Sequence, residues 1–194
     1  GAYGVRQEAL DLLDESFPQR THVNAQLDTP GDISSTTHPR AGQALTGADV
    51  VVQVLADEGL DVLFGYSGGA ILPVYDAIFR HNLENLRADG SEPLPLIVPA
   101  NEQGACFMAA GYARASGKVG AALVTSGPGA TNAVTPVRDC TADSIPLVVI
   151  SGQVPTAAIG TDAFQEAPIS TIMGACAKHV FLVTDANALE ATLR

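Results

Sequence analysis

The sequence predicts an α/β protein with a doubly wound parallel sheet and helices on both faces. Short apolar segments with the length of strands alternate along the chain with segments of helical periodicity. Residues 119–124 are apolar throughout, which is typical of a strand buried on both faces of a parallel sheet. The predicted strands are 62–64, 96–98, 119–124, 146–150 and 180–183.

The first helix of the compact region is predicted to begin after Thr46, whose hydroxyl can cap it. Asp49 follows three residues later, the spacing of a capping box, and Gly59 is placed to end the helix. Apolar residues recur at helical spacing and form the predicted buried stripe: Val50, Val51, Val54 and Leu55. A second helix begins near Ala70, with Pro73 in its first turn, and residues 80–95 are expected to be partly looped.

Glu102 is predicted to lie in the first turn of a helix that follows the 96–98 strand. Asn101 can cap this helix, and its apolar face is expected to include Ala105 and Met108. In open α/β sheets, ligands bind in the crevice beyond the carboxyl ends of the strands. The neighbours of Glu102 include Ala, Gly, Cys and Phe and no adjacent cation, so we expect this carboxylate to be largely buried, which suits proton transfer. On position alone, the commoner role of such a glutamate is to complement the positive end of the helix dipole.

Two glycine-rich segments, 65–69 and 125–132, each follow a predicted strand. Glycines allow another backbone or a ligand to approach closely. The second segment can cradle a phosphate or form a tight turn, and it matches neither the P-loop nor the G-x-G-x-x-G pattern. It leads into one predicted helix over 130–141. A long loop over 151–165, a short helix over 167–173 and a last helix from Asp185 complete the chain.

The chain divides into an amino-terminal extension, 1–45, and a compact domain, 46–194. The extension is expected to hold an acidic helix over 5–17 and then a flexible loop over 18–40, in which His22 and His38 are solvated. The apolar pattern of the last helix is unfinished at Arg194, which predicts a domain truncated at its carboxyl end.

The composition excludes several classes of partner. The formal net charge of -11 argues against nucleic acid and anionic membranes, which attract basic surfaces. No apolar run reaches the roughly 18 residues of a membrane span. The three cysteines lack any Cys-x-x-Cys pair, which favours buried thiols in a reducing compartment such as the cytoplasm over disulfides or a metal site.

Four motifs in order resemble the amino-terminal, pyrimidine-binding domain of acetohydroxyacid (acetolactate) synthase, a thiamine-diphosphate enzyme. The resemblance covers roughly three quarters of the chain, from Thr46 onward. The motifs are 64–66 with 68–76, 102–105 with 111–114, 126–132, and 160–166. The resemblance implies the fold of this domain type and, for 126–129, a close-packed turn instead of a phosphate site.

The resemblance also implies roles for individual residues. In the family the glutamate at the position of Glu102 hydrogen-bonds the aminopyrimidine ring of the cofactor and assists the proton transfer that activates it. Tyr66, Gly68 and Gly69 would line the cofactor pocket. Phe164 and Gln165 would face the substrate, Gln165 with a catalytic role. The implied reaction is decarboxylation of pyruvate followed by addition to a second 2-keto acid, a step in branched-chain amino-acid biosynthesis.

Cofactors and partners follow from the same resemblance. Thiamine diphosphate would be bound together with Mg²⁺, which a domain outside this chain would hold, and the family admits FAD. A diphosphate-binding domain of the same or another subunit and a homo-oligomeric assembly are implied, with an organellar location in eukaryotes. The 194 residues alone are therefore expected to be folded but catalytically inactive.

The sequence departs from the family pattern at several positions. Ser67 stands where the family usually has proline, and Asn101 where it has histidine; residues 174–177 also replace a proline-containing segment. These departures leave open another thiamine-diphosphate enzyme, of sulfoacetaldehyde acetyltransferase-like or decarboxylase-like type. A non-catalytic binding or assembly module is the alternative of a different class.

Overall fold

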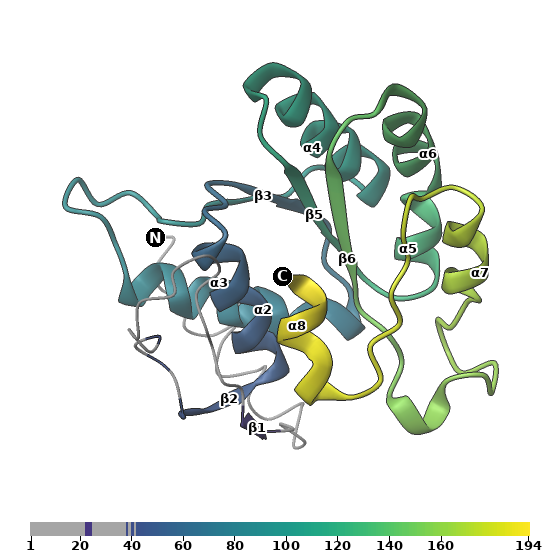
Figure 1. Cartoon of the computed structure of the whole chain (residues 1–194), viewed down its shortest axis with the longest axis horizontal. Coiled ribbons are helices and arrows are strands. Elements are labelled where there is room, and N and C mark those ends of the chain that lie inside the picture. Colours follow the sequence, from purple (N-terminus) through teal and green to yellow (C-terminus); the bar gives the residue numbers. More distant parts are fainter. Residues whose placement is uncertain (1–21, 25–37, 39, 41) are drawn as a thin grey trace.

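The computed structural model describes residues 22–24, 38, 40 and 42–194 (Figure 1). A four-stranded parallel sheet with the order β4-β3-β5-β6 forms its centre. The strands are β3 (Leu63–Gly65), β4 (Leu96–Ile97), β5 (Gly120–Val124) and β6 (Leu147–Ser151). The chain passes from β3 outward to β4, then returns to the other side of β3 with β5. The winding direction therefore reverses between β3 and β5, which confirms the doubly wound sheet.

Helices cover both faces of this sheet, as predicted (Figure 1). They are α2 (Gly47–Asp57), α3 (Leu72–Glu84), α4 (Glu102–Ser116), α5 (Pro128–Asn132), α6 (Val134–Asp143), α7 (Ile169–Gly174) and α8 (Leu189–Leu193), with 3-10 turns η1 (Gly69–Ile71), η2 (Thr156–Ala158) and η3 (Ala186–Ala188). Because side chains alternate along a strand, Leu63 and Leu123 pack against α2 and α3, whereas Phe64 and Val124 pack against α4 on the opposite face.

Local capping signals place the two principal helices as the sequence predicts. Thr46 and Asp49 form the reciprocal capping box of α2, with the Asp49 N–H donating to Thr46 Oγ1 at 3.2 Å. Asn101 caps α4 by accepting from the Gly104 N–H at 2.7 Å. These caps fix the first residue of each helix, so the position of Glu102 follows directly from the identity of Asn101.

Several predicted elements differ in the structure. Residues 180–183 form no strand: Phe181 is 69% exposed, and β6 pairs only with β5 among the described residues. The helix predicted over 130–141 is two helices, α5 and α6, that meet at Ala133. Helix α3 continues to Glu84 because the buried Asn82 side chain exchanges hydrogen bonds with the main chain of Leu94. Met108, predicted on the buried face of α4, is 41% exposed.

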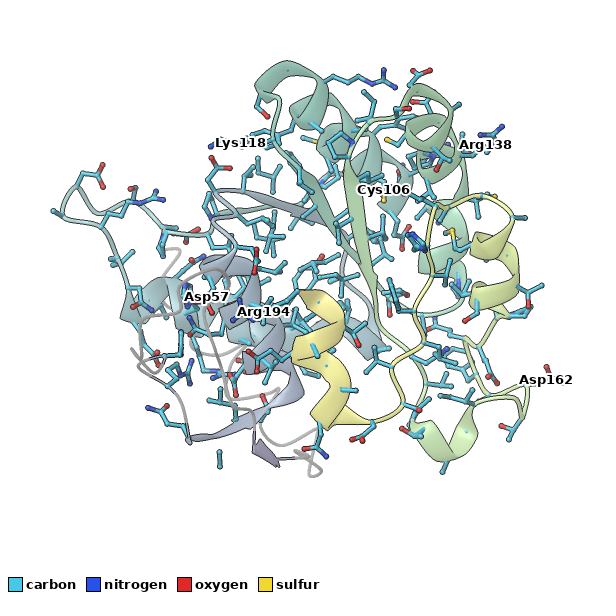
Figure 2. The ribbon with its side chains drawn as sticks, viewed as in Figure 1. Asp57, Cys106, Lys118, Arg138, Asp162 and Arg194 are labelled. Carbon is cyan, nitrogen blue, oxygen red and sulfur yellow. The ribbon has the colours of Figure 1, made fainter. Side chains whose placement is uncertain are left out.

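The amino-terminal extension lies largely outside the described residues, including the helix predicted over 5–17. Within the segment expected to be a flexible loop, β1 (His22–Asn24) pairs antiparallel with β2 (Ala44–Thr46). His38, expected to be solvated, is buried, and its Nε2 lies 3.3 Å from Asp57 Oδ1. Figure 2 shows Asp57 beside Arg194, whose guanidinium lies 2.9 Å from Asp57 Oδ2 and connects α8 to α2.

No helix among the described residues is long and apolar enough to cross a membrane.

Candidate functional site

The candidate site lies at the carboxyl ends of β3, β4 and β5, where the winding direction of the sheet reverses. The segment after β3 contains Tyr66, Gly68 and Gly69, and the segment after β5 begins with Thr125. Glu102 begins α4, which follows β4. The parallel strands bring these three chain segments to the same edge of the sheet, and this is the place where open α/β sheets bind ligands.

Glu102 is buried, as predicted, with 8% of its surface exposed. Its Oε2 accepts a hydrogen bond from Asn132 Nδ2 at 2.9 Å, and Asn132 is the last residue of α5. No ion pair of the described residues includes Glu102. The carboxylate is therefore held by an amide from a neighbouring helix and is not neutralised by a cation. A residue that only complemented the helix dipole would not need this burial.

The glycines beside Glu102 leave no room for larger side chains. A Cβ atom on Gly129 would lie 2.7 Å from Thr125 Cγ2 and 3.3 Å from Glu102 Oε1. A Cβ atom on Gly68 would lie 2.5 Å from the same Thr125 methyl group. Thr125 thus sits between the segment after β3 and α5, and its Oγ1 also accepts from the Ala70 N–H at 3.3 Å. The structure brings Gly68 and Glu102 together through Thr125 and Gly129.

The other residues predicted to line the cofactor pocket are more open. Tyr66 is 37% exposed, and its N–H donates to the Leu123 carbonyl at 3.1 Å, which ties the segment after β3 to β5. Gly69 has no neighbouring atom within 4 Å of the position of a Cβ atom, so its surroundings are open space. A closely packed Gly68 followed by an open Gly69 gives a segment that is fixed on one side and accessible on the other.

The residues predicted to face the substrate lie in the loop over 160–166. The main chain of Gln165 contacts Gly127: a Cβ atom on Gly127 would lie 2.2 Å from the Gln165 carbonyl oxygen. Gln165 has a positive φ of 58°, and Phe164 is 88% exposed. The structure therefore joins this loop to the segment after β5 through main-chain contact. It leaves the Phe164 ring in solvent.

The loop over 160–166 is closed by the carboxylate of Glu166, for which the sequence predicts no such role. Glu166 accepts hydrogen bonds from the N–H groups of Gly160 at 2.5 Å and Ala163 at 3.1 Å. The hydrogen bond from Gly160 and those from neighbouring N–H groups lower the pKa of Glu166. Figure 2 shows Asp162 at the outer end of this loop, away from the body of the domain.

The charge of Glu102 contributes to the raised pKa values of two buried groups close to the site. Burial, and secondarily the charge of Glu102, raise the pKa of the Tyr75 hydroxyl, which is the one buried side-chain polar atom without a hydrogen-bond partner among the described residues. Burial, with smaller contributions from Cys140 and Glu102, raises the pKa of Cys106 to about 12. Cys106 lies inside the domain one turn after Glu102 (Figure 2). Both groups are neutral at physiological pH, so neither adds a charge beside Glu102.

Sequence reasoning missed Asn132 and Thr125 as individual contacts. Both belong to the glycine-rich segment 125–132, so the signal that marked the segment was present. The particular contacts depend on how α5 turns after Gly127, and no local pattern shows this.

Among the residues that the structure describes, no group of three His, Cys, Asp or Glu side chains is placed to hold a metal ion.

In a comparison with known protein families, residues 45–173 match the family described as "Thiamine pyrophosphate enzyme, N-terminal TPP binding domain". The chain is 53% identical over 145 residues to the mitochondrial acetolactate synthase catalytic subunit of Saccharomyces cerevisiae, covering 75% of this chain and 20% of the relative. It is 49% identical over 150 residues to the acetolactate synthase large subunit of Haemophilus influenzae, covering 77% and 24%.

A third relative is matched over a longer part of this chain. The acetolactate synthase large subunit of Corynebacterium glutamicum is 41% identical over 169 residues, which cover 87% of this chain and 25% of the relative. The chain thus spans about a fifth to a quarter of the length of these curated relatives.

Proposed function

Because the chain belongs to the family of amino-terminal TPP binding domains of thiamine pyrophosphate enzymes, we propose that it is the pyrimidine-binding part of a thiamine-diphosphate-dependent 2-keto acid carboligase of the acetolactate synthase type. The observation that carries this proposal is the buried carboxylate of Glu102 at the reversal of the sheet, which forms no ion pair among the described residues. The acetolactate synthase names of the relatives support the substrate class, a pair of 2-keto acids.

The residues present fit the pyrimidine end of the cofactor. Glu102 Oε2 is held by Asn132, whereas no hydrogen bond of the described residues uses Oε1, which can therefore bond a protonated ring nitrogen. Tyr66 and the open Gly69 offer an accessible surface for a flat ring beside Gly68. When bound, thiamine diphosphate supplies the carbon nucleophile and the electron sink for decarboxylation and carboligation.

In this proposal Glu102 holds and exchanges a proton at its carboxylate oxygen. Burial strengthens the hydrogen bond because water does not compete for the same oxygen. A positioned acid–base group of this kind contributes about 10²–10⁴ in rate. Gln165 and Phe164 would contact the 2-keto acid substrate; their place in a loop anchored to Gly127, outside the residues around Glu102, supports this division.

The remaining parts of the active site would come from outside this chain. A diphosphate-binding domain, of the same or another subunit in a homo-oligomer, would hold Mg²⁺ and the diphosphate, and FAD is a further candidate cofactor. The matched segments cover only 20% and 25% of the length of two relatives, which supports the existence of such a domain. The chain alone would then be inactive. We propose a cytoplasmic location, or an organellar one in a eukaryote, which agrees with the mitochondrial and chloroplastic names of two relatives.

The proposal is tested by Glu102→Gln in the complete enzyme that contains this chain. Exchange of the thiazolium C2 proton of thiamine diphosphate into deuterated buffer should slow by at least about tenfold. Glu84→Gln is the matched control, since Glu84 is an exposed glutamate on α3. Equal exchange rates in the Glu102→Gln variant and the unaltered enzyme would refute the role of Glu102.

A further inference from the structure

We propose that Asn132 is a positioning residue for Glu102: its side-chain amide fixes the rotamer of the carboxylate and occupies Oε2, so that only Oε1 is presented to a ligand. This inference rests on the proposed role of Glu102 and adds a second residue to it. The two residues are 30 positions apart in the chain and meet because α5 follows β5 while α4 follows β4.

The geometry of α5 makes the contact specific. The Gly129 N–H donates to the Ser126 carbonyl at 3.1 Å, and the Thr131 N–H donates to the Gly127 carbonyl at 2.9 Å. These bonds join the short helix to the residues that directly precede it, in the segment after β5. Asn132 then ends the helix, and its Nδ2 reaches Glu102 Oε2 at 2.9 Å. The backbone of Asn132 is therefore held in place by the segment 125–132, and residues of this segment also lie against the Glu102 carboxylate.

The two oxygens of Glu102 have different surroundings. Oε2 accepts from Asn132, while Oε1 faces Gly129, where a Cβ atom would lie 3.3 Å away. A larger residue at 129 would crowd the oxygen that has no partner among the described residues. The amide on one side and the glycine on the other thus leave Oε1 as the carboxylate oxygen without a hydrogen-bond partner among the described residues, and in this proposal it is the oxygen that exchanges a proton.

An amide donor suits this site better than a cation. A hydrogen bond to the charged form of a carboxylate offsets the cost of burying it. Asn132 itself is exposed, and a lysine or arginine at the same place would set a full opposite charge beside the buried carboxylate and oppose its protonation much more strongly. Asn132 therefore keeps Glu102 oriented without adding an opposite charge that would prevent the carboxylate from accepting a proton.

The test uses Asn132→Ala and Asn132→Asp in the complete enzyme, with Thr131→Ala as the control on the same helix. Near neutral pH, Asn132→Ala should slow C2-proton exchange about tenfold, the worth of one hydrogen bond to a charged group. The acid limb of the pH–rate profile should move to higher pH, and further still in Asn132→Asp, where two carboxylates compete for one proton. A residue that acts only on stability would not move this limb.

A second readout needs no cofactor. In the ¹⁵N-labelled 194-residue chain, Glu102→Gln should shift the side-chain amide signals of Asn132 and speed their exchange with water, whereas Thr131→Ala should leave them unchanged. If Glu102→Gln slows C2 exchange but neither Asn132 variant alters the pH–rate profile, the role of Asn132 is refuted and the proposed function stands. If Glu102→Gln itself leaves C2 exchange unaltered, the proposed function fails.

Discussion

Replacing Gly127 with alanine should displace the loop over 160–166 and reduce activity more than it reduces stability. Gly127 has a φ of 49° and a ψ of -108°, a conformation that residues with a Cβ atom rarely adopt. The added Cβ would lie 2.2 Å from the Gln165 carbonyl oxygen. Ordinary contact begins at 3.4 Å, so one main chain must retreat by about 1.2 Å.

Two costs combine in this variant. The backbone strain at Gly127 costs on the order of 1–3 kcal/mol of stability. Movement of the loop relieves the contact with Gln165 but misplaces the residues proposed to face the substrate. A displacement of about 1 Å in a reacting constellation can reduce the rate about 100-fold. Because the loop is exposed, we expect it to move and the sheet to stay in place.

Gly117→Ala is the matched control. Gly117 also has a positive φ, 73°, but no atom lies within 4 Å of the position of its Cβ atom. Both variants therefore carry a conformational cost, and only Gly127→Ala adds a collision. Denaturant unfolding gives the stability loss, and amide hydrogen exchange over 160–166, together with product formation by the complete enzyme, reports the loop. Equal exchange in the two variants would refute the steric reasoning.

Two further predictions concern stability and thiol reactivity. Burial would raise the pKa of Asp49, but hydrogen bonds with Thr46 and the charge of Arg80 together lower it below its ordinary value of 3.8. Asp49→Asn should therefore reduce the free energy of unfolding by about 1 kcal/mol at neutral pH. That difference in thermal stability should vanish as the pH falls below 3.8, and a constant difference would contradict it. Because burial raises the pKa of Cys106 to about 12, iodoacetamide should alkylate the half-buried Cys176 first in the folded chain, and mass spectrometry showing equal rates would contradict this.

Features that depend on a few neighbouring residues could be predicted from the sequence. The caps at Thr46 and Asn101 are local hydrogen bonds, and alternation of strands and helices determines a parallel sheet. The place of Glu102 follows from both, since a cap after a strand puts the first helical residue at the sheet edge. The burial of Glu102 was predicted from its apolar neighbours and is confirmed.

Features that depend on the meeting of distant segments could not be predicted. The bond between Asn132 and Glu102 requires the direction of α5, which the positive φ of Gly127 sets. The contact of Gln165 with Gly127 likewise joins two loops. Residues 180–183 have the composition of a strand, but a strand also needs a partner, and composition alone does not provide one. Local apolarity was a sound guide to burial in the sheet centre and a poor one at its edge.

The last prediction concerns the charge that closes the loop over 160–166. Glu166→Gln keeps one acceptor oxygen of the carboxylate and replaces the other with a donor, so the bonds from Gly160 and Ala163 cannot both be kept. Amide exchange at these two positions, measured by NMR, should quicken. Because these bonds lower the pKa of Glu166 below 4.5, the unaltered loop should keep its protection from neutral pH to below that value and lose it in stronger acid. Asp162→Asn removes the same charge at a positive φ that asparagine tolerates, and it should leave exchange unchanged. Similar exchange in both variants would mean that the contact with Gly127, and not the Glu166 carboxylate, holds the loop in place.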